Sequence, residues 1–285
     1  AGGFDSFSAH RAQYFNPDGD GIMFFEKAMR FGSKYQDNLK SMQINLFEEE
    51  VSSTFEDFNI PECETWSNLE LLKKEKEVVG IYISSHPLDN YKKEIENFST
   101  TPLTILNNLE KIINKDFYFS GIINEVEHLI SRNGYNFGRF ILEDFFDQYE
   151  FRIFGEEYLK FKHFIEAYQF IRIKVSIREG WKNRETGKIG PPRIKFNHFE
   201  LLRDTIKINS KKLILSSDLN FLDEDQISKI QKILNRYKGN KPISFDVYHP
   251  KDKMRIILNS RKQKVDVCPE LLDELDTASI KYQIK

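Results

Sequence analysis

The sequence lacks most of the features that mark secreted, membrane-embedded or disulfide-bonded proteins. Its two cysteines, Cys63 and Cys268, fall in different predicted units and indicate neither a disulfide framework nor a metal motif. No apolar run reaches the ~18 residues of a membrane-spanning helix. The start, AGGFDSFSAHR, lacks an initiator Met and the basic and then apolar stretch of a signal peptide. We therefore expect a fragment of a longer protein, in a reducing, cytoplasmic compartment.

Motifs for chemistry are also missing. The stretch NPDGDG at 16–21 imitates the start of a calcium loop, but the twelfth position of that loop is Lys27 where a Glu ligand is needed. The six histidines are scattered and form no zinc motif. No acid pair, nucleophile or cluster of metal ligands has the spacing that catalysis or metal binding requires. We therefore predict no catalytic residue, no metal site and no cofactor in this chain.

Charge is nearly balanced overall, at a formal net charge of -2, but it is unevenly distributed. Residues 48–64 contain Glu and Asp and no Lys or Arg. Residues 169–203 contain a basic set: Arg172, Lys174, Arg178, Lys182, Arg184, Lys188, Arg193, Lys195 and Arg203. This asymmetry predicts one region held away from phosphates and another offered to them.

The order of periodic segments predicts an α+β protein of several domains. Residues 1–40 are expected to be helical, 41–65 an acidic linker and 66–115 a helical connector. In 116–203, three strands, a helix and two further strands follow one another, which is the order of an OB-fold β-barrel. Residues 211–285 are expected to form a C-terminal domain with the order β-α-β-β-α-β, the split βαβ arrangement.

Alternation along the second and third expected strands separates inward from outward side chains. Gly138, Phe140 and Leu142 should point inward, as should Phe151 and Ile153. Outward aromatic and basic residues, together with the polar loop before the last strand, predict a single-strand DNA site. Its residues are Tyr135, Phe137, Arg139, Arg152, Trp181, Lys182, Arg184, Lys188, Arg193 and Lys195. The alternative is a solvated polar loop on a barrel that packs against a neighbour.

A short peptide in the acidic linker has the pattern of sliding-clamp-binding motifs. It consists of Gln43, Ile44, Asn45, Leu46 and Phe47. In such peptides the Leu-Phe pair fills an apolar pocket and the Gln amide forms hydrogen bonds at its rim. The alternative interpretation is that Leu46 and Phe47 anchor the linker to a neighbouring helix.

Taken together, these segments resemble the C-terminal region of the bacterial DNA polymerase III alpha subunit, the replicative DNA polymerase. AGGFDSFSAHRAQ is similar to the end of that family's helix-hairpin-helix region, and the clamp peptide QINLF follows it. EKEVVGIYISSHPLDNY, at 75–91, is similar to a recognisable segment of the family that contains His-Pro. GYNFGRFILED resembles its OB domain, and 211–285 resembles its C-terminal domain.

The resemblance implies a role in replication. The parent protein would be a DNA-directed DNA polymerase, a nucleotidyltransferase that uses Mg²⁺, whose catalytic residues lie outside this chain. The expected partners are single-stranded template DNA, the sliding clamp (beta) and the clamp-loader tau subunit, with no membrane. The alternatives are a free-standing single-strand DNA-binding or repair accessory protein and, less in keeping with the missing acid clusters, a nuclease.

Overall fold

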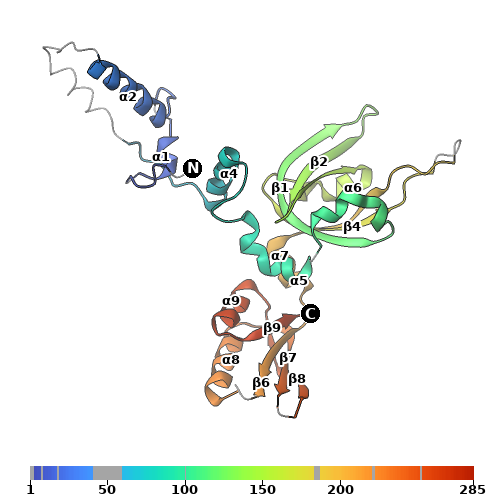
Figure 1. Ribbon diagram of the computed structural model, residues 1–285. Coiled ribbons are helices and arrows are strands. Elements are labelled where there is room, and N and C mark those ends of the chain that lie inside the picture. Colours follow the sequence, from blue (N-terminus) through green and yellow to red (C-terminus); the bar gives the residue numbers. More distant parts are fainter. Residues whose placement is uncertain are drawn as a thin grey trace. The chain divides into compact units, whose positions relative to one another are not determined.

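The structure is a computed structural model that describes residues 3–7, 9–17, 19–40, 60–99, 101–182, 187–219, 222–250 and 252–285, with side chains for all of these except 38–40. The chain divides into two compact units, Ala1–Pro87 and Leu88–Lys285. Helices occur in both units, and the second unit contains two β-sheets (Figure 1). The predicted α+β class is therefore confirmed.

The first unit is helical where it is described. Its helices are α1 (Arg11–Tyr14), α2 (Phe24–Lys40) and α4 (Asn68–Val79). The bounds of α4 follow from local chemistry. Ser67 Oγ accepts a hydrogen bond from the Glu70 N–H, and the Glu70 carboxylate accepts one from the Ser67 N–H (2.8 Å). This capping box satisfies free N–H groups at the start, and Gly80, with φ of 89°, ends the helix in a left-handed conformation.

Glu75, on α4, holds the loop that follows the helix. Its carboxylate accepts hydrogen bonds from the backbone N–H groups of Ser84 and Ile83 (3.1 Å each) and from Ser84 Oγ (2.8 Å). The hydrogen bonds from Ser84, with a smaller one from Ile83, hold the pKa of Glu75 below its usual value. Within EKEVVGIYISSHPLDNY, the acidic residue and the Ile-Ser pair thus act together as a local loop anchor.

The second unit begins with short helices and continues into a five-stranded antiparallel sheet. The helices are η1 (Pro87–Tyr91), α5 (Lys92–Phe98) and η2 (Leu103–Ile112). The strands are β1 (Asp116–Ile130), β2 (Asn136–Glu143), β3 (Gln148–Phe154), β4 (Phe170–Arg178) and β5 (Arg193–Leu201). α6 (Gly155–Phe161) and η3 (Lys162–Phe164) lie between β3 and β4, so the expected order of strands and helix is confirmed.

β1 is shared between two neighbours, and a glycine allows it. The first part of β1 pairs with β4, the second part pairs with β2, and the sheet order is β3-β2-β1-β4-β5. A Cβ added at Gly121 would lie 2.3 Å from the Glu143 carbonyl oxygen, so only glycine permits this close approach of β1 and β2.

Isoleucine and phenylalanine make up most of the core of this sheet. All the residues expected to face inward from β2 and β3 are buried there, as alternation predicted. Rings from the two edge strands meet: the centroids of Phe151 on β3 and Phe196 on β5 are 5.7 Å apart. No β3–β5 ladder occurs among the described residues, so the sheet curls toward closure without forming a closed barrel.

The last part of the chain has the expected element order but a different strand arrangement. Its elements are β6 (Leu213–Asp218), α8 (Glu224–Arg236), β7 (Lys238–His249), β8 (Met254–Val265), α9 (Pro269–Thr277) and β9 (Lys281–Ile284). The sheet order is β8-β7-β6-β9, and β6 and β7 are hydrogen-bonded parallel neighbours. The split βαβ prediction is thus corrected: that arrangement would insert β8 between β6 and β7, whereas here β8 lies at an outer edge beside β7. Element order alone does not say where a strand enters the sheet.

Both helices of this part pack on one face of its sheet, and helices from outside it complete the core. Leu271, Leu272 and Leu275 of α9 share one cluster with Ile206, which belongs to α7 (Leu202–Asn209). Phe98 of α5 packs against the same cluster. The C-terminal core therefore extends beyond the segment 211–285.

None of the helices that the structure describes is both long and apolar enough to cross a membrane.

Candidate nucleic-acid interface

The clamp-peptide residues Gln43, Ile44, Asn45, Leu46 and Phe47 lie outside the described residues, and so does Arg184. The clamp-peptide interpretation therefore stays a prediction. The other residues of the expected DNA site fall in two places on the five-stranded sheet, the β2–β3 face and the connection between β4 and β5.

On the β2–β3 face, the aromatic residues are only partly available. Tyr135, immediately before β2, is 72% exposed. Phe137 is half-buried because its ring stacks on Phe154, with centroids 5.0 Å apart. The structure thus leaves Tyr135 open for stacking on a base, whereas one face of Phe137 is already occupied.

The arginines of this face are surrounded by carboxylates. Arg139 forms ion pairs with Glu127 (3.1 Å), Glu150 (3.3 Å) and Glu125 (3.7 Å). Arg152 pairs with Glu150 at 2.8 Å. These carboxylates compensate both positive charges and would repel a phosphate backbone. The alternation pattern alone did not reveal this, because Glu125 and Glu127 come from β1 and only the β1–β2 register places Glu127 opposite Arg139.

The connection between β4 and β5 is different. Trp181 is 75% exposed, and the guanidinium carbon of Arg193 lies 3.9 Å from the centroid of its ring. Arg193 Nε also donates to the Glu179 carbonyl oxygen at 3.3 Å, which fixes the guanidinium over the ring. This arrangement is a preformed cation–π pair on an exposed loop.

The two sides of this connection approach each other closely. Lys182 and Ile189 form an isolated antiparallel bridge. A Cβ at Gly180 would lie 2.1 Å from the Gly190 carbonyl oxygen, so glycine is required where the two sides meet. The exposed lysines Lys182, Lys188 and Lys195 lie along this connection, whose described residues, 179–182 and 187–195, we call the β4–β5 arm.

At the base of the arm, one carboxylate organises the outward side chains of β4. Asp116 lies 3.6 Å from Lys174 Nζ and 3.7 Å from Arg178 Nη2, and it accepts a hydrogen bond from Ser176 Oγ. That hydrogen bond, together with the two cations, holds the pKa of Asp116 below its usual value. Asp116 is therefore an ionised counter-charge for two residues of the predicted basic set.

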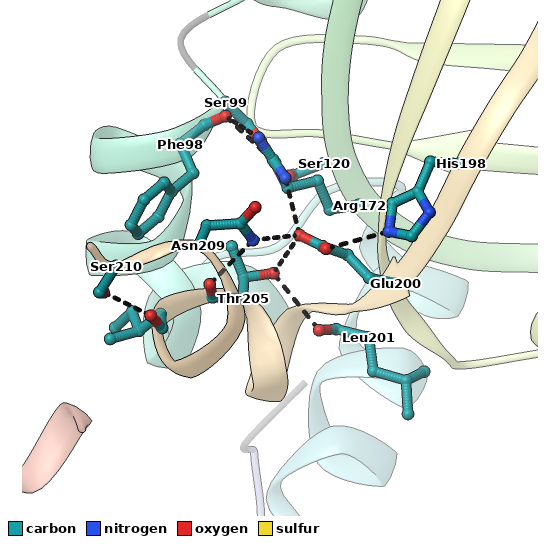
Figure 2. Close-up of polar contacts among 11 residues, drawn as sticks. Phe98, Ser99, Ser120, Arg172, His198, Glu200, Leu201, Thr205, Asn209 and Ser210 are labelled. Carbon is teal, nitrogen blue, oxygen red and sulfur yellow. Dashed lines mark hydrogen bonds and ion pairs between the residues drawn. The ribbon is translucent and has the colours of Figure 1, made fainter. Parts of the chain in front are cut away.

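Arg172, another member of the basic set, is not available to phosphates at all. Its side chain is 6% exposed and Nη1 donates to Glu200 Oε1 at 2.7 Å. Figure 2 shows the two side chains pointing toward one another beside α7. Arg172 also donates to the Phe98 carbonyl oxygen (2.9 Å from Nη2) and to Ser99 Oγ (3.0 Å from Nε). The inclusion of Arg172 in a phosphate-facing surface is therefore corrected: helices α5 and α7 cover it.

Three further groups contact Glu200, two of them from α7 and one from β5 itself. Asn209 Nδ2 donates to Glu200 Oε1 at 2.8 Å, and Thr205 Oγ1 does so at 3.2 Å. His198 Nε2 lies 3.3 Å from Glu200 Oε2 (Figure 2). The ring of Tyr118 covers the Arg172 guanidinium at 4.0 Å. Every group in this network has a partner, which is the condition under which a buried ion pair is tolerated.

In the described part of the chain, no group of three or more His, Cys, Asp or Glu side chains is placed so that it could hold a metal ion.

Comparisons with known proteins match the C-terminal domain to a family model and about half of the chain to longer relatives. Residues 213–285 match the family model described as "DNA polymerase III alpha subunit, C-terminal domain". The DNA polymerase III subunit alpha of Borreliella burgdorferi is 32% identical over 168 residues, which are 58% of this chain and 14% of that protein. Its counterpart in Treponema pallidum is 30% identical over 142 residues, 49% of this chain and 11% of that protein.

A third relative, from Aquifex aeolicus, is 35% identical over 117 residues, which are 41% of this chain and 10% of that protein. The chain thus spans between a tenth and a seventh of the length of these relatives. The resemblance predicted from the sequence is confirmed: the chain is homologous to the C-terminal region of the DNA polymerase III alpha subunit.

Proposed function

We propose that the chain is a non-catalytic part of a cytoplasmic replicative DNA polymerase that binds single-stranded template DNA, the sliding clamp and the clamp loader. The observation that supports DNA binding most directly is the exposed Trp181–Arg193 pair on the cationic β4–β5 arm. An exposed aromatic ring stacks on bases of any sequence, and neighbouring cations attract the phosphate backbone.

We interpret the five-stranded unit as an OB-type fold. Three antiparallel strands, a helix and two further strands follow in the order of that fold, and the rings of its two edge strands meet in the core. OB-folds bind single strands through one sheet face and through the loops that join strands 1–2 and 4–5. Tyr135 in the first of these loops and Trp181 in the second are both largely exposed.

Within this unit, the electrostatics favour the arm over the β2–β3 face. Three carboxylates surround Arg139, whereas the nearest partners of Arg193 are an aromatic ring and a carbonyl oxygen. We therefore assign the principal DNA contacts to Trp181, Arg193 and the arm lysines, with Tyr135 as a second stacking position. Arg139 and Arg152 orient the sheet surface and contribute little to phosphate binding.

Binding of the two protein partners is proposed from the resemblance. The clamp would take the peptide Gln43 to Phe47, with Leu46 and Phe47 in an apolar pocket. A peptide of this size binds with about micromolar affinity, and tethering to DNA raises its effective concentration. The C-terminal domain would dock the clamp-loader tau subunit. Polymerisation, with its Mg²⁺ and deoxynucleotides, would belong to the remainder of a full-length alpha subunit.

The DNA-binding proposal is tested with a fluorescent single-stranded oligonucleotide at low salt. Trp181→Ala should weaken binding by roughly 1–3 kcal/mol, the usual range for one base–aromatic contact. Phe146→Ala is the matched control, because Phe146 is equally exposed (76%) but lies in the β2–β3 connection, away from the arm. Equal losses in the two variants would refute the assignment to the arm.

The clamp proposal is tested separately by capture on immobilised sliding clamp. Replacing Leu46 and Phe47 by Ala should abolish capture, whereas Phe55→Ala and Phe58→Ala, in the same acidic stretch, should leave it unchanged. A chain that binds single strands but never the clamp would instead support the free-standing single-strand-binding protein.

A further inference from the structure

Strand β8 is an edge of the C-terminal sheet and exposes an unusual amount of apolar surface. Met254, Ile256, Ile257 and Leu258 are 53%, 48%, 61% and 53% exposed, respectively. β8 pairs with β7 on one side, and its other side has no strand partner in the described sheet. A long, apolar edge with free backbone N–H and C=O groups is a template for a further strand unless something covers it.

The exposed side chains are arranged as a binding surface. Ile256 is opposite Val247 and Leu258 is opposite Phe245, on the sheet face that α8 and α9 cover. Asn235 of α8 accepts a hydrogen bond from Gln263 of β8 at 3.3 Å, so this side of α8 turns toward β8. Ile227, about two turns earlier on α8, is also 52% exposed.

Cations stand at both ends of the apolar stretch. Lys253 precedes it, and Arg261, Lys262 and Lys264 follow it on the same strand; all four are exposed. None of the four forms an ion pair with a carboxylate among the described residues. A strand that pairs with β8 therefore gains from carboxylates at both of its ends.

A second copy of this chain fits this charge pattern poorly. Antiparallel pairing of two β8 strands about Ile257 would place Lys253 of one copy opposite Arg261 of the other. In that register, the cationic ends of one copy would face the cationic ends of the other. Like charges directly opposite one another are destabilising. The arrangement favours a partner that differs from this chain.

We propose that β8 binds an extended segment of a partner protein by strand addition, and that this segment is apolar at alternate positions and acidic at both ends. The apolar residues pack on Ile256 and Leu258, and the carboxylates pair with Lys253 and with the cations that follow residue 260. This inference deepens the proposed docking role of the C-terminal domain and rests on it for the identity of the partner.

The probe is a synthetic peptide, Glu-Glu-Val-Thr-Val-Thr-Val-Glu-Glu, whose binding to residues 1–285 is followed by fluorescence anisotropy. The double variant Ile256→Lys, Leu258→Lys should weaken binding at least about tenfold. Leu159→Lys, at a somewhat more exposed apolar position on α6 (61%), is the control and should bind normally. Circular dichroism checks that each variant is folded.

Charge reversal gives a test that does not depend on the apolar substitutions. The triple variant Arg261→Glu, Lys262→Glu, Lys264→Glu should lose the acidic peptide and gain affinity for a version with Lys at both ends. Absence of binding to the acidic peptide, or binding that none of these variants changes, overturns the proposal. A dimer in sedimentation that Ile256→Lys dissociates also overturns it, because the occupant is then a second copy.

The same variants separate this inference from the docking role. If tau binds the chain and the β8 variants do not weaken that binding, the inference fails and the docking role stands. If the peptide binds β8 and tau does not bind the chain, the docking role fails and β8 remains a strand-addition site for another partner.

Discussion

Two arginines on the outer face of the same sheet have opposite surroundings. Arg172 on β4 is opposite Ser120 of β1, and Arg139 on β2 is opposite Glu127 of β1. Helices α5 and α7 cover Arg172, whose side chain is 6% exposed, whereas Arg139 faces solvent and is 29% exposed. Each pairs with glutamate, yet one pair lies in a low-dielectric interior and the other on a screened surface.

The comparison shows that residue type and strand position do not set the role of a basic residue. The role depends on which elements cover the side chain. The covered arginine donates hydrogen bonds to the Phe98 carbonyl oxygen at the end of α5 and to Glu200 of β5. Glu200 in turn accepts hydrogen bonds from Thr205 and Asn209 of α7. The uncovered arginine is neutralised by its neighbours. Neither is open to phosphate, and the arm residue Arg193 is the one of the three that presents its charge beside an exposed ring.

The largest difference between the two arginines should appear in stability. Arg172→Ala leaves the buried Glu200 carboxylate without its ion partner, and we expect a loss of about 3–5 kcal/mol in the free energy of unfolding. Arg139→Ala removes surface ion pairs, for which about 1 kcal/mol or less is expected. Urea denaturation of both variants measures the contrast, and equal losses would contradict the distinction between covered and uncovered pairs.

The next expected difference is in DNA binding, between the lysines of the β4–β5 arm and the arginines of the β2–β3 face. Replacing Lys182, Lys188 and Lys195 by Ala should flatten the slope of log K against log salt by roughly 0.7 for each lysine–phosphate interaction removed. Arg139→Ala and Arg152→Ala should leave that slope unchanged, because neighbouring carboxylates already compensate these charges. Oligonucleotide titrations between low and moderate salt measure the slopes. A change confined to the β2–β3 variants would reverse the assignment.

The smallest expected effect concerns Asp116 and pH. The hydrogen bond from Ser176, with Lys174 and Arg178 nearby, lowers the pKa of Asp116 in the folded chain. Because the folded pKa is the lower one, the stabilisation is complete above the unfolded pKa, near ~4, and is lost as pH falls through the folded value. Asp116→Asn should therefore cost less than about 1 kcal/mol at pH 7, and the cost should shrink on acidification.

Unfolding of wild type and Asp116→Asn at neutral and acidic pH gives the comparison directly. Ser176→Ala, which removes the hydrogen-bond donor and keeps the carboxylate, should show a weaker pH dependence than the wild-type chain. A difference between wild type and Asp116→Asn that grows as pH falls would contradict the sign of the pKa shift.

Much of the local structure followed from the sequence. Alternation on β2 and β3 identified Gly138, Phe140, Leu142, Phe151 and Ile153 as inward residues, and all are buried. Element order was predicted in both sheets. These features depend on the two-residue period of strands and on turn residues, which are properties of neighbouring positions along the chain.

The sequence alone could not predict which basic residues are free. Arg172 and Arg193 lie in the same basic stretch, yet Arg172 meets Phe98 and Glu200 from distant segments while Arg193 meets Trp181 on an exposed arm. The carboxylates around Arg139 come from a different strand, through a register that no local pattern specifies. The same limit applies to β6 and β7, whose direct parallel pairing replaced the expected split arrangement.

The sequence by itself determined the family, the α+β class, the order of the elements and the inward faces of the strands, because each of these is encoded in short-range patterns. Only the tertiary structure decided which arginine is buried, which is neutralised and which edge strand stays open. Those outcomes depend on contacts between residues far apart in the chain, where burial removes water from a charge and strand register chooses its partner.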